Sequence, residues 1–162
     1  MAFVLERALS TWSSNAADVV TVADTLHEIL EEEERPAFVK TTGKTGLHVF
    51  VSWESEGGYD DARSWAETIA AQVVKALPRQ ATVERSKSNR GRRVYVDVMQ
   101  NARGHHAVPP YVLRAVPGAP VSTPLNWREV TTELDPADFN IKTIFRRLQR
   151  QKNDPTARLI HS

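Results

Sequence analysis

The sequence contains no cysteine. Disulfides, thiolate metal sites and a cysteine nucleophile are therefore excluded. The sequence also lacks any apolar run near the roughly 18 residues that span a bilayer. Residues 1–5 have neither the basic region nor the long apolar stretch of a signal peptide. We therefore expect a cytoplasmic protein without a membrane partner.

The length bounds the number of domains. A chain of 162 residues is long enough for one hydrophobic core and too short for two domains of ordinary size. Its composition is that of a common soluble globular protein. We expect a single domain over residues 1–152, followed by a flexible tail over residues 153–162.

Charge is distributed unevenly along the chain, although the formal net charge is only +1. Residues 1–34 hold eight acidic side chains against one arginine, and Glu31 to Glu34 form a continuous run. Residues 85–114 hold seven basic side chains against one aspartate, and residues 140–162 hold six against one. This asymmetry indicates one surface that meets polyanions, although solvated surface alone also accounts for it.

Hydrophobic spacing predicts helices alternating with strands. Apolar residues at helical spacing predict helices at residues 16–33, 59–77, 123–130 and 140–151. Alternation and turn composition predict strands at residues 37–40, 47–53, 93–100 and 111–116. On the last helix we expect Ile141, Ile144, Phe145 and Leu148 to face the core. The fold class is α+β, with a mixed, largely antiparallel sheet and helices packed on it.

Two polar residues lie on strands that would otherwise be apolar. His48 alternates with Leu47 and Val49, and Asp97 alternates with the valines of its strand. A buried aspartate needs a partner or a metal ion to offset its desolvation. Together with the turn at residues 42–46, these residues suit a site that holds a divalent cation and phosphates. A structural histidine and an aspartate paired with an arginine are the alternatives.

The sequence excludes a Walker A loop and a metal site at two adjacent histidines. Residues 41–45 resemble a Walker A loop, but the first glycine is missing and a strand follows where that motif needs a helix. His105 and His106 are adjacent, so in an extended chain they point apart, and no third ligand is evident.

Several longer motifs resemble one known family. Residues 40–51 (KTTGKTGLHVFV) resemble the second motif of the polymerase domain of bacterial ATP-dependent DNA ligase D, in the archaeo-eukaryotic primase superfamily. Residues 93–101 (RVYVDVMQN) resemble its third motif, and residues 107–125 resemble the segment that closes the domain. The similarity runs in order from about residue 19 to residue 147.

The resemblance implies a fold, a reaction and partners. The fold would be that of the catalytic core of archaeo-eukaryotic primases. The reaction would be template-directed nucleotidyl transfer from NTP or dNTP, dependent on two divalent ions, Mg²⁺ or Mn²⁺, in non-homologous end-joining DNA repair. The partners would be DNA ends or a primer-template, nucleotides, a ligase and end-binding repair proteins.

The resemblance also assigns roles to individual residues. Asp97 matches a catalytic, metal-binding carboxylate, and His48 matches the histidine that supports the triphosphate. The other positions that match nucleotide-binding residues are Thr42, Lys44, Arg90, Gln100 and Arg114.

The sequence departs from the family in its first residues. The family carries two metal-binding aspartates one residue apart, whereas the counterpart here is residues 3–7 (FVLER). Val4 would replace the first ligand, and Glu6 would be the substitute for the second. Three hypotheses follow: an active polymerase, a relative that binds nucleotides or DNA without catalysis, or a protein-interaction domain that uses its acidic helix. We also expect the family's N-terminal region to be missing.

Overall fold

The computed structural model describes residues 1–6, 16–53, 58–105 and 107–157, except for the side chain of Glu6. Its six-stranded sheet has the order β4-β5-β1-β3-β2-β6. The strands are β1 (Ala2–Glu6), β2 (Ala37–Thr41), β3 (Gly46–Val51), β4 (Ala81–Thr82), β5 (Val94–Asp97) and β6 (Pro124–Leu125). All neighbours are antiparallel except β4 and β5. The predicted α+β class with a largely antiparallel sheet is confirmed.

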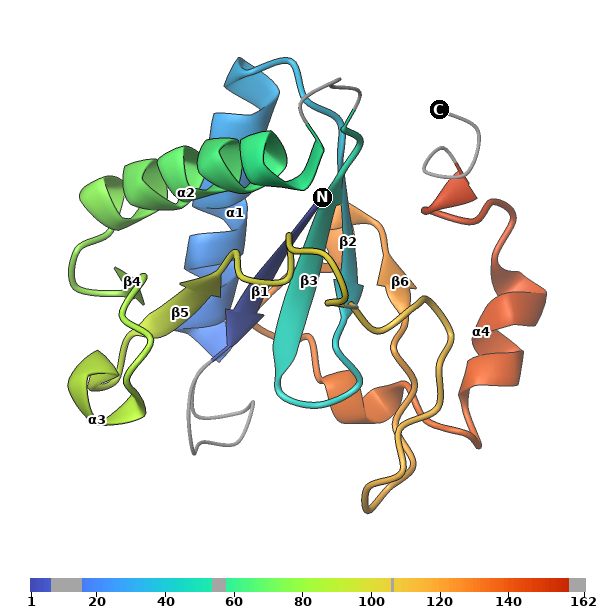
Figure 1. Ribbon diagram of the computed structural model, residues 1–162. Coiled ribbons are helices and arrows are strands. Elements are labelled where there is room, and N and C mark those ends of the chain that lie inside the picture. Colours follow the sequence, from blue (N-terminus) through green and yellow to red (C-terminus); the bar gives the residue numbers. More distant parts are fainter. Residues whose placement is uncertain (7–15, 54–57, 106, 158–162) are drawn as a thin grey trace.

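Two long helices, α1 (Ala16–Glu32) and α2 (Gly58–Ala76), cover one face of this sheet (Figure 1). The shorter helical segments are α3 (Lys87–Arg90), η2 (Trp127–Glu129), η3 (Pro136–Asp138) and α4 (Ile144–Arg150). α4 lies beyond the edge strand β6, on the opposite side of the molecule from the C-terminal end of α2 (Figure 1).

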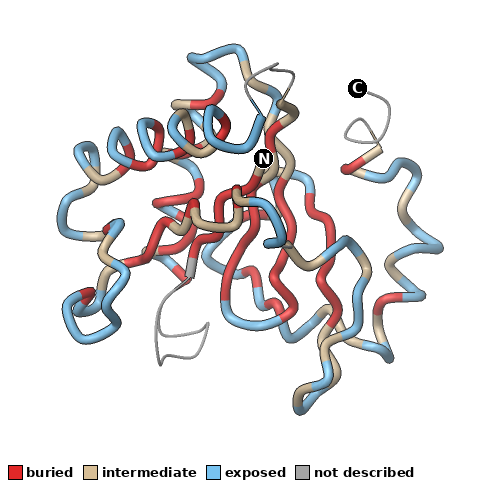
Figure 2. The backbone as a smooth tube through the Cα atoms, in the orientation of Figure 1, coloured by how far each residue is buried: buried red, intermediate tan, exposed pale blue. Residues whose placement is uncertain are grey.

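The core lies between the sheet and the two long helices. Alternate residues of the central strands, such as Phe3, Leu5 and Val49, have no exposed surface and contact the apolar stripes of both helices. The continuous run of buried backbone through the central strands is visible in Figure 2. Because side chains alternate along a strand, the residues between them point to the other face, which the long helices leave open.

Most predicted regular elements are confirmed, and three differ. Residues 111–116 form no strand but one side of an irregular hairpin, with a single bridge from Leu113 to Val121. Four prolines in residues 109–120 remove backbone donors, and Tyr111 has a φ of +62°. The predicted helix at residues 123–130 is also wrong. Pro124 and Leu125 extend the sheet at its edge, where proline is tolerated, and η2 then starts with an Asn126–Glu129 capping box.

The third difference concerns the last predicted helix, which is shorter and less buried than expected. α4 begins at Ile144, and only this residue faces the core, with 6% exposure. Ile141, Phe145 and Leu148 are 47%, 65% and 40% exposed. The expected burial of these three residues is therefore wrong. The flexible tail stays a prediction: Thr156 is buried in a turn beside Asp154, and residues 158–162 lie outside the described residues.

Candidate phosphate-binding site on the open sheet face

A row of paired residues crosses the open face of the sheet. Val4 of β1 is opposite Asp97 of β5 on one side and opposite His48 of β3 on the other. His48 is in turn opposite Lys40 of β2, which is opposite Pro124 of β6. Directly opposite residues project from the same face. The two strand residues singled out from the sequence, His48 and Asp97, are therefore in one row, with Val4 between them.

Lys40 and His48 form a buried polar cluster with Ser122. Lys40 has no exposed surface, and its Nζ lies 2.8 Å from His48 Nδ1 and 2.5 Å from Ser122 Oγ. Ser122 Oγ also donates to the carbonyl of Thr41 at 2.9 Å. Among the described residues, Lys40 forms no ion pair with a carboxylate. Among the described residues, the acceptors within hydrogen-bond distance of the Lys40 Nζ are therefore all neutral.

Burial sets the protonation of this cluster. Desolvation lowers the pKa of Lys40 to about 7, and the nearby Arg114 guanidinium acts in the same direction. Desolvation, with Lys40 and Arg114, lowers the pKa of His48 to about 3, so its imidazole is neutral near pH 7. A protonated Lys40 has only donors, which makes Nδ1 of His48 the acceptor and places the ring proton on Nε2. His48 Nε2 is therefore a neutral hydrogen-bond donor.

The turn that joins β2 to β3 adds further donors. Thr42 is 8% exposed, its Oγ1 accepts from the N–H of Lys44, and its carbonyl accepts from Arg114 Nη1 at 3.1 Å. Gly43 has a φ of +71°, and a β-carbon there would lie 2.6 Å from Arg114 Cγ. Glycine at this position therefore lets the arginine stem pass close to the turn. The Lys44 side chain is exposed at the tip.

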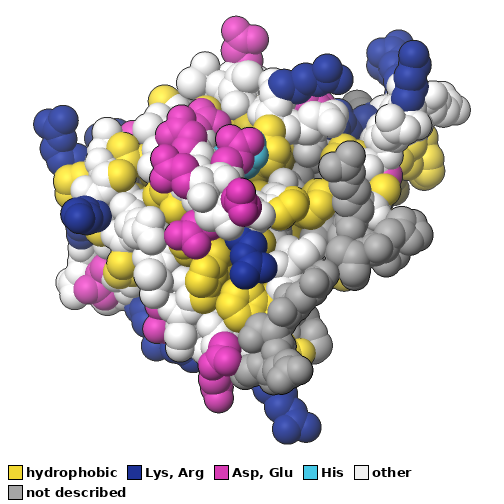
Figure 3. Space-filling model, turned by 90° about the horizontal axis from the view of Figure 1, so that it is seen from above, with side chains coloured by type: hydrophobic (Ala, Val, Ile, Leu, Met, Phe, Trp, Pro, Cys, Tyr) yellow, Lys and Arg dark blue, Asp and Glu magenta, His cyan; other side chains and the backbone are white. Residues whose placement is uncertain are grey.

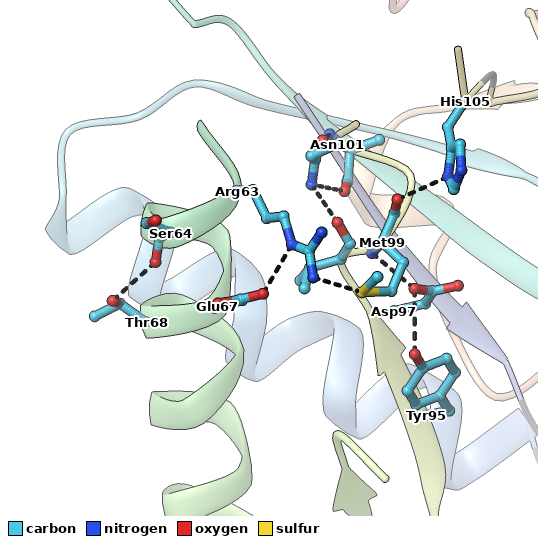
Figure 4. Close-up of polar contacts among 11 residues, drawn as sticks. Arg63, Ser64, Glu67, Thr68, Tyr95, Asp97, Met99, Asn101 and His105 are labelled. Carbon is cyan, nitrogen blue, oxygen red and sulfur yellow. Dashed lines mark hydrogen bonds and ion pairs between the residues drawn. The ribbon is translucent and has the colours of Figure 1, made fainter. Parts of the chain in front are cut away.

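Asp97 is held by its own strand and the loop after it. Its Oδ1 accepts from the N–H of Met99 at 2.8 Å and from the Tyr95 hydroxyl at 3.3 Å (Figure 4). Val4 is 6% exposed and contributes no ligand atom. Within the described residues, no group of three or more histidine or acidic side chains lies close enough to hold a metal ion. The Glu6 side chain lies outside the described residues. The described residues alone therefore do not fit a two-ion centre.

The remaining predicted site residues make no hydrogen bond to the Lys40–His48–Ser122 cluster among the described contacts. Arg90 is 5% exposed, donates to the carbonyls of Glu84 and Arg85, and stacks 3.7 Å from the ring centroid of Tyr95. Its Nη1 is buried and has no hydrogen-bond partner among the described residues, so its predicted role in nucleotide binding stays a prediction. Gln100 lines a cavity of about 400 Å³ together with Phe50, whose ring centroid lies 5.8 Å from that of His48 and 5.6 Å from the Lys40 Nζ. Of the two adjacent histidines that the sequence rejects as a metal pair, His105 contacts the Met99 carbonyl, and His106 is outside the described residues.

Sequence reasoning missed Lys40 and Ser122 as parts of the site. The signal for Lys40 was present, because the alternation of two strands joined by a tight turn puts Lys40 on the same face as His48. Ser122 gave no such signal, since the irregular hairpin brings it from a distant part of the chain.

The fold is that of an α+β protein, and the family comparison assigns it to the primase-polymerase class. The chain belongs to the family described as "LigD, primase-polymerase domain", whose profile matches residues 13–156. The family resemblance noted from the motifs is thereby confirmed. In the described part of the chain, no helix is long and apolar enough to cross a membrane.

Similar proteins of known name agree with this assignment. The chain is 29% identical over 126 residues to the multifunctional non-homologous end joining protein LigD of Pseudomonas aeruginosa. It is 31% identical over 133 residues to the bifunctional LigD of Bacillus subtilis. These matches cover 78% and 82% of this chain but only 15% and 22% of the two relatives.

A solved structure shares the fold. The polymerase domain of Mycobacterium tuberculosis ligase D in complex with DNA superposes with a TM-score of 0.88 at 25% sequence identity. The match covers 98% of this chain and 54% of the solved chain.

Proposed function

We propose that the open sheet face binds the triphosphate of a nucleotide, and that the chain serves DNA end joining as the nucleotide-binding part of a LigD-type polymerase. The observation that carries this proposal is the buried Lys40–His48 pair, which lies beside Arg114 without a described carboxylate to neutralise it. A buried cation is costly unless it is paired. A bound polyanion supplies the missing negative charge.

The donors around the cluster are of the kinds that hold phosphate groups. Arg114 offers a planar guanidinium, His48 a neutral N–H, and the Thr42–Lys44 turn offers a hydroxyl and a lysine. Mg²⁺ or Mn²⁺ would accompany the triphosphate. The DNA complex of the Mycobacterium tuberculosis relative supports DNA ends or a primer-template as the second ligand. A ligase and end-binding repair proteins would be the protein partners.

Template-directed nucleotidyl transfer is the second candidate, which Asp97 favours because it stands in the same row as His48. A metal-binding aspartate at that position is what the reaction requires. In the described row of opposite residues, Asp97 is the one carboxylate. Transfer by this chain therefore needs at least one further ligand from outside them, such as Glu6.

Two measurements test these functions. Titration with ATP in the presence of Mn²⁺ should show binding that Arg114→Gln weakens tenfold or more, because a charge-assisted hydrogen bond is lost. The exposed Arg79→Gln variant is the matched control and should bind like the parent. Equal affinities for all three proteins would refute the proposed site.

Primer extension on a gapped template with Mn²⁺ and ribonucleotides separates the two candidates. Incorporation by the parent that is lost in Asp97→Ala would establish nucleotidyl transfer. If neither protein extends the primer while both bind ATP, the chain binds nucleotides without performing the chemistry.

A further inference from the structure

Exposed apolar side chains gather in one region of the described surface. Seven large apolar side chains are exposed there, and five of them belong to two short segments: Val112, Leu113, Ile141, Phe145 and Leu148. Phe145 is the most exposed of the seven, at 65%. Apolar side chains that lie together in water mark an interaction surface more often than scattered ones do.

The two segments adjoin in the fold. Leu113 pairs with Val121 across the irregular hairpin, and the next residue, Pro120, pairs with Asn140. The hairpin therefore lies beside the turn that starts with Ile141 and leads into α4. We call the five exposed side chains of these segments the apolar face.

Exposed cations accompany the apolar face. Lys142 lies three positions before Phe145, a spacing that makes side chains neighbours on a helical path. Arg147 is occupied otherwise: it forms a two-point ion pair with Glu129 at 2.7 and 2.9 Å and so anchors α4. The cations that are exposed and form no ion pair with another described residue are Lys142, Arg146 and Arg150.

A surface of opposite charge lies at the C-terminal end of α1, on a different part of the molecule from α4 (Figure 1). A pocket of about 450 Å³ opens there at the start of β2. Its lining combines apolar side chains with carboxylates: Pro36, Ala37, Phe38, Glu31 and Glu34, together with His27 and Arg35. The neighbouring Glu28, Glu32 and Glu33 are exposed, and Figure 3 shows acidic side chains gathered on this surface. We call this region the acidic pocket.

The acidic pocket has fixed walls. His27 stacks on Trp127, with 3.8 Å between the ring centroids. The Arg35 guanidinium lies over the rings of Trp53 and Trp65, at 5.7 and 6.0 Å from their centroids. Because these aromatic contacts hold the only two basic side chains of the lining, the exposed carboxylates around the pocket remain in excess.

We propose that this chain associates head to tail with a second copy of itself, so that the apolar face of one copy docks on the acidic pocket of the next. Phe145 enters the pocket, and the cations beside it meet the carboxylates. Two apolar faces in symmetric contact would instead bring like charges together, which disfavours that arrangement. A head-to-tail contact leaves one surface of each kind free, so further copies can add. The contact does not depend on the sheet-face site.

Sedimentation velocity over a range of protein concentrations, at low and at high salt, tests this contact. The parent should associate at low salt and less so at high salt. Phe145→Ala should weaken association roughly tenfold or more, because the ring is the largest apolar group in the contact. The matched control is Tyr59→Ala, which removes an aromatic side chain of similar exposure, 61%, outside both surfaces and should associate like the parent.

A mixture of two variants tests the head-to-tail arrangement itself. Glu31→Lys/Glu34→Lys should lose association as well, since the new cations repel those beside the apolar face. Phe145→Ala keeps an intact acidic pocket, and Glu31→Lys/Glu34→Lys keeps an intact apolar face. The two variants in equal amounts should therefore form a 1:1 dimer and no larger species.

Each contrary outcome overturns the proposal. A parent that stays monomeric at low salt would show that the two surfaces do not bind each other. Association by Phe145→Ala equal to that of the parent, or an equal loss in Tyr59→Ala, would exclude the apolar face. A dimer of either variant alone, or none in the mixture, would exclude the head-to-tail contact. ATP binding by Phe145→Ala should equal that of the parent, so a failure of the sheet-face site would be seen separately.

Discussion

Replacing Lys40 with methionine should remove a specific pH dependence from the stability of this protein. Methionine is unbranched and fills a lysine-shaped space without a charge. In the parent, Lys40 has a folded-state pKa of about 7 against 10.5 in an exposed chain. At a pH between these two pKa values, Lys40 is protonated in the unfolded chain and neutral in the folded chain. The free energy of unfolding therefore increases with pH in this window. Below pH 7 Lys40 is protonated in both states, and the increase is absent.

The magnitude follows from the two pKa values. From pH 7 to pH 9 the unfolded chain keeps its proton on Lys40 while the folded chain releases it, which increases the free energy of unfolding by about 2 kcal/mol. His48, whose pKa falls from 6.5 to about 3, contributes only about 0.2 kcal/mol over the same interval. Groups such as the buried N-terminal amine of Met1 titrate in both proteins and cancel in the comparison.

Urea unfolding at pH 7, 8 and 9 measures the effect directly. The parent should gain about 2 kcal/mol more than Lys40→Met over this range. Parallel pH profiles for the two proteins would refute the reasoning, since they would show that Lys40 is charged throughout in the folded state.

At pH 8 the parent should also take up a proton when it binds ATP, because the added negative charge raises the pKa of Lys40. Calorimetry in buffers of different ionisation enthalpy detects this uptake, which Lys40→Met should lack.

Two further substitutions test the geometry around the site. Gly43→Ala should weaken ATP binding and destabilise the fold by more than the roughly 1 kcal/mol that a positive φ costs alanine, because its β-carbon displaces Arg114; Gly118→Ala, at a φ of +84° with open space around it, is the control and should show only the backbone cost in urea unfolding. Asn101→Ala should cost about 2–4 kcal/mol, since the Asn101 amide accepts from and donates to the backbone of Ala2; a loss below 1 kcal/mol in the same assay would contradict that account.

The elements that the sequence predicted correctly are those whose pattern repeats. Apolar residues repeat at helical spacing over several turns of α1 and α2, and at alternate positions in the β2–β3 hairpin. The burial of these side chains confirms the predicted elements. β4 and β6 have two residues each and no period to read. Their positions depend on pairing with β5 and β2, which local sequence does not encode.

The failures at the site have a different cause. A lysine is expected at the surface from sequence alone. Lys40 is buried because Ser122 and the edge strand β6, which are distant in sequence, pack beside it. The apolar spacing around Phe145 identified the helix correctly but not its environment, because periodicity reports which residues share a face and not whether anything covers that face. Both errors concern long-range packing, which the local sequence does not encode.

The position of β1 in the sheet constrains how this protein folds. The first strand of the chain is central, with β3 on one side and β5 on the other. The second pairing joins Val4 to Asp97, so it cannot form during synthesis until residue 97 has left the ribosome. Such distant contacts slow folding, and an apolar strand that waits for its partner is a target for aggregation or for chaperones. The strand on which the candidate site is centred is therefore enclosed on both sides only after β5 has formed.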